Sequence, residues 1–263
     1  MAIQTFIFFD LETTGLPGQE KNQTKITELT FLAVLRRDIE KVNNCTLPPI
    51  SKLSFLFNPK RNIQREVVKI TGLSNDFLCN QPIFKDKIKC INEFLELPKP
   101  VCLVAHNGDR FDFKILKTEY ADVEASLPDD LLCIDSMKAF RDILKNGQSF
   151  SPNAITPLNH TQETLDWPEL DLTPEDWTEI DQLSESLTKL TSTPKKIKVK
   201  PLQSYALSYL YNFFVKKQPK ESHRAEADCY MLLECVLAIK QEFLHWADQN
   251  YKYIKEIKPL SRK

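Results

Sequence analysis

FIFFDLETTGLP, residues 6–17, begins with an apolar segment and continues into two carboxylates. The apolar half is typical of a buried β-strand. Successive side chains of a strand point to opposite faces, so Asp10 and Glu12 share one face while Leu11 points to the other. Two acids on one face repel each other unless a cation or a proton lies between them. The end of this strand is therefore a candidate site.

The order of the expected elements indicates a mixed α/β sheet. Apolar and alternating runs predict strands at residues 3–11, 26–37, 51–59, 101–105 and 131–135. Helical periodicity predicts helices at residues 62–73, 84–97, 201–214 and 222–246, with others starting near Asp109 and after the strand at 131–135. The first three strands have no helix between them, which favours an antiparallel meander. We expect one domain over residues 1–263, with helices packed on a five-stranded sheet.

Composition and charge exclude several classes of protein. Lys and Arg total 35 against 36 Asp and Glu, so any nucleic-acid contact must be local rather than spread over a polycationic surface. The seven cysteines include no C-x-x-C pair and favour free thiols in a reducing compartment. The N-terminal residues fit a first strand rather than a signal peptide, and the apolar stretch at 229–239 is too short and too charged to span a membrane. We expect a protein of the cytoplasm or the nucleus, with no membrane partner.

Residues 146–200 differ in composition from the rest of the chain. Between 146 and 193 there are nine acids and one Lys, with recurrent prolines, and the segment ends in the basic run KKIKVK at 195–200. Such a composition is typical of a segment that buries little apolar surface. We therefore expect an acidic, flexible surface insertion within the domain, with the basic run as a solvated stretch.

Two further clusters carry polar side chains that could serve chemistry. AHNGDRFDF, residues 105–113, places Asp112 in the first turn of an expected helix, where a carboxylate also suits the helix dipole. SHRAEAD, residues 222–228, carries His223 and Asp228 at the start of another helix, although a single His there is usually a surface residue. The sequence contains no zinc-ligand spacing, G-x-S-x-G motif or Walker loop, which argues against those enzyme classes.

Together the three clusters resemble a known enzyme family. In chain order, the acidic pair, the aspartate of the second cluster and the His–Asp pair of the third resemble the motifs of the DEDDh superfamily of 3′→5′ exonucleases. The segments FFDLETTGLP, ITGLS, CLVAHNGDRFDF and SHRAEAD more closely resemble the three-prime repair exonucleases. The resemblance covers about residues 3–145 and 201–245, and it implies a ribonuclease H-like fold.

The resemblance also implies a metal-dependent 3′→5′ DNA exonuclease. It assigns two Mg²⁺ ions, which Mn²⁺ can replace, to the carboxylates of Asp10, Glu12, Asp112 and Asp228. It makes His223 the general base that takes a proton from the attacking water. The expected products are nucleoside 5′-monophosphates, released from the 3′ ends of single-stranded, frayed or mispaired DNA during repair or degradation.

The same resemblance places further residues against the substrate. Leu16 and Pro17 match residues that press against the terminal bases, an apolar contact that tolerates any sequence. The other residues expected at the substrate are Ile70, Thr71, His106 and Arg110. For two of these residues a purely structural role stays open, because Ile70 also fits a helix core and Arg110 also fits a solvated surface.

Quaternary structure and substrate class stay open at this point. The family pairs as a homodimer through an edge strand, for which residues 51–59 are the candidate, although their alternation fits a buried strand equally well. A 3′→5′ exoribonuclease of the same superfamily is the rival enzyme interpretation. A degraded nuclease, kept as a nucleic-acid-binding scaffold, is the non-enzyme interpretation, and the presence of all four acids and His223 argues against it.

Overall fold

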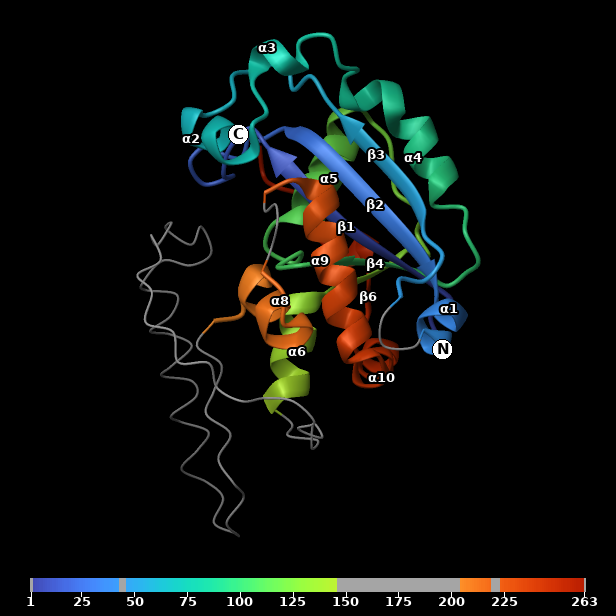
Figure 1. Cartoon of the computed structure of the whole chain (residues 1–263). Helices are drawn as coiled ribbons and strands as arrows, with labels where there is room; N and C mark the ends of the chain where they lie inside the picture. Colours follow the sequence, from blue (N-terminus) through green and yellow to red (C-terminus); the bar gives the residue numbers. More distant parts are fainter. Residues whose placement is uncertain (1, 43–45, 146–203, 219–222, 263) are drawn as a thin grey trace, which may run out of the picture. The chain divides into compact units, whose positions relative to one another are not determined.

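A mixed sheet of six strands, in the order β3-β2-β1-β4-β5-β6, lies at the centre of the described part of the chain (Figure 1). The computed structural model describes residues 2–42, 46–145, 204–218 and 223–262. The strands are β1 (Thr5–Thr13), β2 (Ile26–Leu35), β3 (Ser51–Leu56), β4 (Val101–Ala105), β5 (Leu132–Asp135) and β6 (Lys252–Tyr253). The pairs β1–β2 and β2–β3 are antiparallel, whereas β1, β4 and β5 run parallel. The carboxyl ends of β1, β4 and β5 therefore meet at one end of the sheet.

Helices contribute to the apolar cores on both faces of this sheet. Those in the first part of the chain are α1 (Arg36–Lys41), α2 (Arg65–Thr71), α3 (Asn75–Leu78), η1 (Phe84–Lys87) and α4 (Ile88–Phe94). Those that follow are α5 (Asp112–Asp122), α6 (Ser136–Lys145), α8 (Leu207–Val215), α9 (Ala225–Ala238), α10 (Lys240–Asn250) and η2 (Ile254–Glu256). Within the described ranges, no helix has the length and apolar content needed to cross a membrane.

The mixed α/β sheet expected from the sequence is confirmed, with differences in detail. The strand expected over residues 26–37 ends at Leu35 and leads into α1, so a helix does lie between β2 and β3. The sheet has six strands rather than five, because β6 is only two residues long and gives no alternation that a sequence could reveal. α5 starts at Asp112 rather than near Asp109, whose carboxylate binds Lys138 and Lys252 instead of capping the helix. The insertion expected at 146–200 lies outside the described residues.

Backbone conformation explains where two of the helices end. α2 ends at Gly72, as expected, because this glycine adopts a left-handed conformation (φ 74°) and its N–H donates to the carbonyl of Val68. The helix expected over residues 222–246 is instead two helices, since Ile239 (φ −128°) separates α9 from α10. After this break Phe243 of α10 packs on Phe6 of β1, with 6.0 Å between the ring centres.

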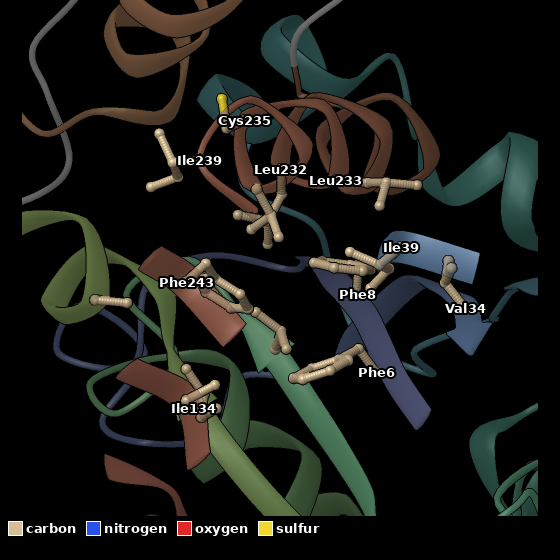
Figure 2. Close-up of a cluster of buried hydrophobic side chains, with 14 of the residues drawn as sticks. Phe6, Phe8, Val34, Ile39, Ile134, Leu232, Leu233, Cys235, Ile239 and Phe243 are labelled. Atoms are coloured by element: carbon tan, nitrogen blue, oxygen red, sulfur yellow. The ribbon is translucent and has the colours of Figure 1, made fainter. Parts of the chain in front are cut away.

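Alternation along β1 divides the core into two clusters, and it also directs the acids. Phe6 and Phe8 face the cluster that α9 covers (Figure 2), whereas Phe9 faces the cluster that includes α4 and α5. Burying an aromatic or aliphatic side chain of this size stabilises the fold by about 1.5–3 kcal/mol, so the apolar core contributes strongly to the packing of α9 on β1. The alternation continues past the apolar run, and Asp10 and Glu12 therefore point to the face that α9 covers.

Candidate active site

Three carboxylates converge where β1 approaches the first turn of α9. Asp10 and Glu12 come from β1 and Asp228 from α9, and one carboxylate oxygen of each lies within 4.8 Å of the others. A register shift between β1 and β2 follows directly after Glu12, and such irregularities commonly re-aim side chains beside functional sites. The structure thus brings together three of the four acids that the sequence indicated as metal ligands.

These acids destabilise one another's charged forms. Burial raises the pKa of Asp10 well above its ordinary value, and the neighbouring carboxylates, Asp228 first, raise it further. The pKa of Glu12 is raised by burial and then by Asp228. Burial raises the pKa of Asp228 to about 7, although the backbone N–H of His223 opposes this shift. A divalent cation would favour the charged forms, and carboxylate oxygens are the hard ligands that Mg²⁺ and Mn²⁺ prefer. The donor set therefore fits a divalent metal.

Asp112, the fourth predicted ligand, begins α5 and is 2% exposed. It is not one of the three converging carboxylates, yet its charge raises the pKa values of Asp10 and Glu12, so it acts on the same site. Gly108 shapes the turn that leads to it. A Cβ at this position would lie 2.6 Å from the ring of Phe113, so glycine permits the close packing that precedes α5.

His223, the predicted general base, stands directly before α9. Its backbone is in a left-handed conformation (φ 66°), and its N–H donates to Oδ2 of Asp228 at 3.1 Å. Residues other than glycine are uncommon in this conformation, and surrounding contacts help to hold them there. The residue is exposed, but desolvation by the surrounding chain lowers the pKa of the ring, which favours the neutral imidazole that accepts a proton.

A fifth carboxylate, that of Glu28, borders the site and lies outside the motifs of the sequence analysis. It is opposite Glu12 on β2, is 3% exposed, and accepts two hydrogen bonds of 2.9 Å from the guanidinium of Arg224. It also accepts the backbone N–H of Ala225, the first residue of α9, at 3.1 Å. The signal available in the sequence is an acid inside the apolar run ITELTFLAVL, since a buried acid needs a partner.

Comparison with known proteins agrees with this geometry. The family model described as Exonuclease (RNase_T) matches residues 7–165. Three-prime repair exonuclease 1 of Bos taurus is 30% identical over an aligned length of 272 residues. The alignment covers 98% of this chain and 70% of the bovine protein. The chain belongs to the three-prime repair exonuclease family. The enzyme class expected from the sequence, a 3′→5′ exonuclease, is thereby confirmed.

Other matches extend the comparison. Three prime repair exonuclease 2 of Mus musculus is 28% identical, over 98% of this chain and 92% of the mouse protein. A crystal structure of E. coli exonuclease I with a dT13 oligonucleotide has a TM-score of 0.57 at 17% identity, covering 94% of this chain but only 43% of that one. Cell-death related nuclease 4 has a TM-score of 0.53 at 12% identity, covering 91% of this chain and 64% of that one. These two structures agree with the ribonuclease H-like fold.

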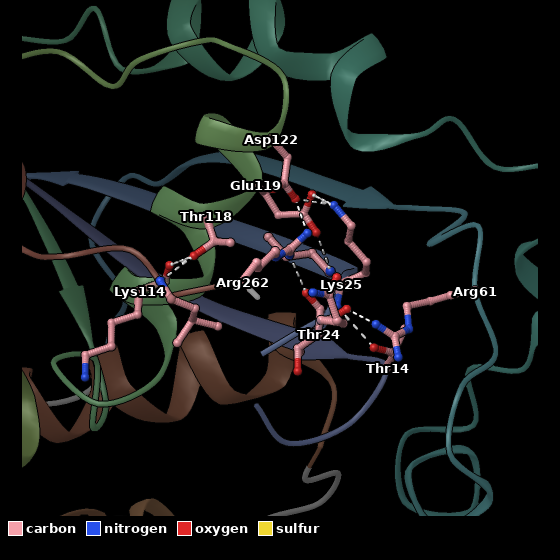
Figure 3. Close-up of polar contacts among 12 residues, drawn as sticks. Thr14, Thr24, Lys25, Arg61, Lys114, Thr118, Glu119, Asp122 and Arg262 are labelled. Atoms are coloured by element: carbon pink, nitrogen blue, oxygen red, sulfur yellow. Dashed lines mark hydrogen bonds and ion pairs between the residues drawn. The ribbon is translucent and has the colours of Figure 1, made fainter. Parts of the chain in front are cut away.

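In this exonuclease the turn after β1 carries Leu16 and Pro17, both half-buried, just beyond the acids. Polar contacts hold the first part of the turn in place (Figure 3). The hydroxyl of Thr14 donates to Glu20 at 2.6 Å, and Arg61 pairs with Glu20 at 3.3 Å. The turn is thus tied to the segment before α2.

The second part of the same turn is anchored to α5. Lys25 pairs with Glu119 at 3.0 Å and with Asp122 at 2.6 Å. Arg262, near the C-terminus, also pairs with Asp122 and donates to the carbonyl of Thr24 at 2.8 Å (Figure 3). The predicted substrate residues of this turn are therefore carried by a segment whose two ends are both fixed.

The segment with Ile70 and Thr71 is held beside this turn. The N–H of Gln64, which directly precedes α2, donates to the carbonyl of Thr14 at 2.9 Å. Thr71 is 6% exposed, and its hydroxyl donates to the carbonyl of Val67 at 3.0 Å, so its polar group serves the end of α2. Ile70 is half-buried and keeps part of its apolar surface accessible.

His106 and Arg110 both lie in the turn after β4, in different surroundings. Arg110 is exposed. Nε2 of His106 donates to the carbonyl of Tyr205 at 2.9 Å, which leaves Nδ1 to accept the hydroxyl of Ser136 at 3.0 Å. The structure therefore uses both ring nitrogens of His106 to tie this turn to α6 and to the segment before α8, and does not bring the ring together with the acids.

We expect the free energy of unfolding to fall as the pH drops from neutrality toward 4, because of His106. Burial lowers its pKa from 6.5 to about 4, so between these values the unfolded chain binds a proton that the folded chain does not. This contribution to the free energy of unfolding is fully present above pH 6.5, and up to about 3 kcal/mol of it is lost as the pH falls to about 4. Urea titrations across this range should show a weaker pH dependence for His106→Gln than for the wild type.

The control is His245→Gln, which changes an exposed residue of α10 and should keep the wild-type pH dependence. An unchanged pH dependence in His106→Gln would show that other groups cause the acid instability.

Proposed function

We propose that this exonuclease removes nucleoside 5′-monophosphates, one at a time, from the 3′ ends of single-stranded, frayed or mispaired DNA, with two Mg²⁺ ions as cofactors. The observation that carries the proposal is the convergence of the carboxylates of Asp10, Glu12 and Asp228 within 4.8 Å. Membership of the three-prime repair exonuclease family supplies the reaction class.

Metal binding falls to the three converging acids together with Asp112. All four donors are carboxylates, which favours Mg²⁺ with Mn²⁺ as a substitute over softer metals. Divalent ions in such a site make water more acidic and stabilise the charge that develops on a phosphodiester during displacement. The raised pKa values of Asp10 and Glu12 support this assignment, because a cation relieves the repulsion that causes them.

His223 acts as the general base in this proposal. Its lowered pKa keeps the imidazole neutral near physiological pH, in the state that accepts a proton from water. The hydrogen bond from its N–H to Asp228 fixes the backbone that carries the ring beside an acid of the cluster. His223 also stands outside the core and is exposed, so water and the end of a nucleic acid can reach it.

Leu16 and Pro17 receive the 3′ end in the same proposal. They are half-buried in a turn that starts one residue after the strand of the acids, and apolar contact with bases does not depend on sequence. An end that is already unpaired needs no strand separation, which favours single-stranded, frayed and mispaired DNA. The E. coli exonuclease I structure with a dT13 oligonucleotide supports a single-stranded substrate by analogy of fold.

A homodimer through β3 is the final part of the proposal. β3 is the first strand of the sheet order, and among the described residues it pairs with β2 alone. Its residues are all exposed or half-buried, and an unpaired edge offers N–H and C=O groups to a second copy of the strand. Light scattering of the purified protein should therefore give the mass of two chains.

A 5′-labelled DNA oligonucleotide tests the proposed function. Incubation with Mg²⁺ should give a ladder of products shortened from the 3′ end, and EDTA should abolish it. A blunt duplex should react more slowly than the single strand, and an RNA of the same sequence more slowly than DNA. Faster degradation of the RNA would favour the exoribonuclease interpretation. Intact but bound strands of both kinds would favour the scaffold interpretation.

A further inference from the structure

Glu28 is an acid that the proposed reaction does not use, although it lies at the edge of the metal site. It projects from β2 on the face of Glu12, its partner across the strands, and its charge raises the pKa values of Glu12 and Asp228. Glu28 is buried beside four other acids, so its negative charge adds to the electrostatic repulsion among them. Its presence therefore needs a reason.

Its hydrogen bonds supply that reason. Both carboxylate oxygens of Glu28 accept from Arg224, at 2.9 Å each, in the forked arrangement that best matches a guanidinium to a carboxylate. One of these oxygens also accepts the N–H of Ala225 at 3.1 Å. Glu28 thus binds two consecutive residues at the start of α9, directly after the general base His223.

The same few residues carry the reactive groups of α9. His223 precedes Arg224 and holds a left-handed conformation, with its N–H on Asp228. Glu28 and Asp228 together therefore define the path of the chain into α9. A conformation that most residues avoid persists where neighbouring contacts over-determine it, and the fork on Glu28 is such a contact.

The charge of Arg224 also acts on Glu12. Arg224 lowers the pKa of Glu12, so its positive charge is felt at a metal-ligand position as well as at Glu28. Glu28 accepts from Nε and from one terminal nitrogen of the Arg224 guanidinium, and this ion pair directs the cation toward Glu28.

We propose that Glu28 and Arg224 form a positioning pair, which sets the approach of His223 and Asp228 to β1 and keeps Glu12 available as a metal ligand. This inference rests on the proposed function for its catalytic part, whereas its metal-binding part can be measured without turnover. Residues that orient metal ligands in this way are worth about 10–100-fold in metal affinity or activity when removed.

The chain offers a closely matched control in Asp248 of α10. Its carboxylate accepts two contacts of 2.9 Å from the guanidinium of Arg36 and one of 3.1 Å from the N–H of Ile3. The three distances equal those around Glu28. Ile3 lies just before β1, at the end of the strand opposite the acids, so Asp248→Asn should remove an equivalent ion pair without touching the site.

The experiment compares Glu28→Gln, Asp248→Asn and the wild type in three measurements: kcat and KM on single-stranded DNA, Mn²⁺ binding by calorimetry without DNA, and thermal unfolding. Both variants should lower the unfolding temperature by similar amounts. Only Glu28→Gln should also lower kcat, by about 10–100-fold with little change in KM, and weaken Mn²⁺ binding by about 10-fold. Equal effects of the two variants on kcat and on Mn²⁺ binding would reduce the pair to a structural ion pair and overturn the proposal.

Three further variants, namely Arg224→Gln, Arg224→Lys and the double variant with Glu28→Gln and Arg224→Gln, separate the roles of the partners. Glu28→Gln combined with Arg224→Gln should bind Mn²⁺ more tightly than Glu28→Gln alone, because no arginine is left to pair with Glu12. Arg224→Lys keeps the charge but loses the fork, and should fall between the wild type and Arg224→Gln in kcat. If Arg224→Gln raises KM and leaves kcat unchanged, Arg224 contacts the substrate and the positioning role is wrong.

The two proposals fail in different ways. An inactive wild type would refute the proposed function. The comparison of Mn²⁺ binding between the wild type and Glu28→Gln would still test the positioning pair. An active wild type with an equally active Glu28→Gln variant would refute the pair alone.

Discussion

Asp10→Asn should abolish exonuclease activity and at the same time make the metal-free protein more stable. The loss of activity follows because Asp10 is one of the three converging carboxylates proposed to hold the metal ions, and loss of a group that stabilises transition-state charge, here a divalent ion, costs about 100- to 1,000-fold. The gain in stability follows because a buried negative charge disappears from among its like-charged neighbours, which is worth on the order of 1 kcal/mol. Exonuclease assays with Mg²⁺ and thermal unfolding in EDTA measure the two effects.

Asp135→Asn is the matched control for this prediction. Asp135 is also a buried acid at the carboxyl end of a parallel strand, but its carboxylate accepts N–H groups from Met137 at 3.0 Å and Asp109 at 3.3 Å. Asparagine has one acceptor oxygen where aspartate has two, so the two backbone N–H donors lose part of their acceptor. Stability should therefore fall, while activity stays near that of the wild type. A destabilised Asp10→Asn variant would mean that the acids support the fold rather than work against it.

The sequence was sufficient for features that depend on periodicity within one element. Alternation in a strand places Asp10 and Glu12 on one face whatever surrounds them, and the structure finds both on the face that α9 covers. The antiparallel pairing of β1, β2 and β3 was also predicted from the alternation of their residues, although the expected absence of a helix between them was wrong, because α1 lies between β2 and β3. The end of α2 at Gly72 follows from the backbone freedom of glycine, which is also a local property.

The features that could not be predicted from the sequence depend on contacts between residues far apart in the chain. Glu28 and Arg224 are 196 residues apart, and no local pattern shows that they bind each other. Asp109 was a reasonable helix cap by its position, but Lys138 and Lys252 bind it instead, and the helix starts later. His106 was expected at the substrate, and the sequence could not show that Tyr205 and Ser136 contact its two ring nitrogens. Tertiary contacts decided each of these cases, and local chemistry could not.

His223→Asn should lower kcat while metal binding is retained, which would separate the general base from the metal ligands. Asparagine is the suitable replacement because it tolerates the left-handed backbone that His223 adopts (φ 66°), so the N–H to Asp228 can be kept. It cannot accept a proton near neutral pH, and loss of general-base catalysis costs about 100- to 10,000-fold. KM for single-stranded DNA and the affinity for Mn²⁺ should change by no more than about threefold, since the ring is neither a ligand nor a stacking surface in the proposed mechanism.

The contrast with two other variants makes this prediction specific. Asp10→Asn should lose both kcat and Mn²⁺ affinity, whereas His245→Gln, at an exposed position of α10, should lose neither. A rate near that of the wild type in His223→Asn would mean that solvent takes the proton and that His223 serves only to direct the chain into α9. Loss of Mn²⁺ binding in the same variant would instead place the imidazole among the ligands, because a neutral ring nitrogen binds divalent transition metals readily.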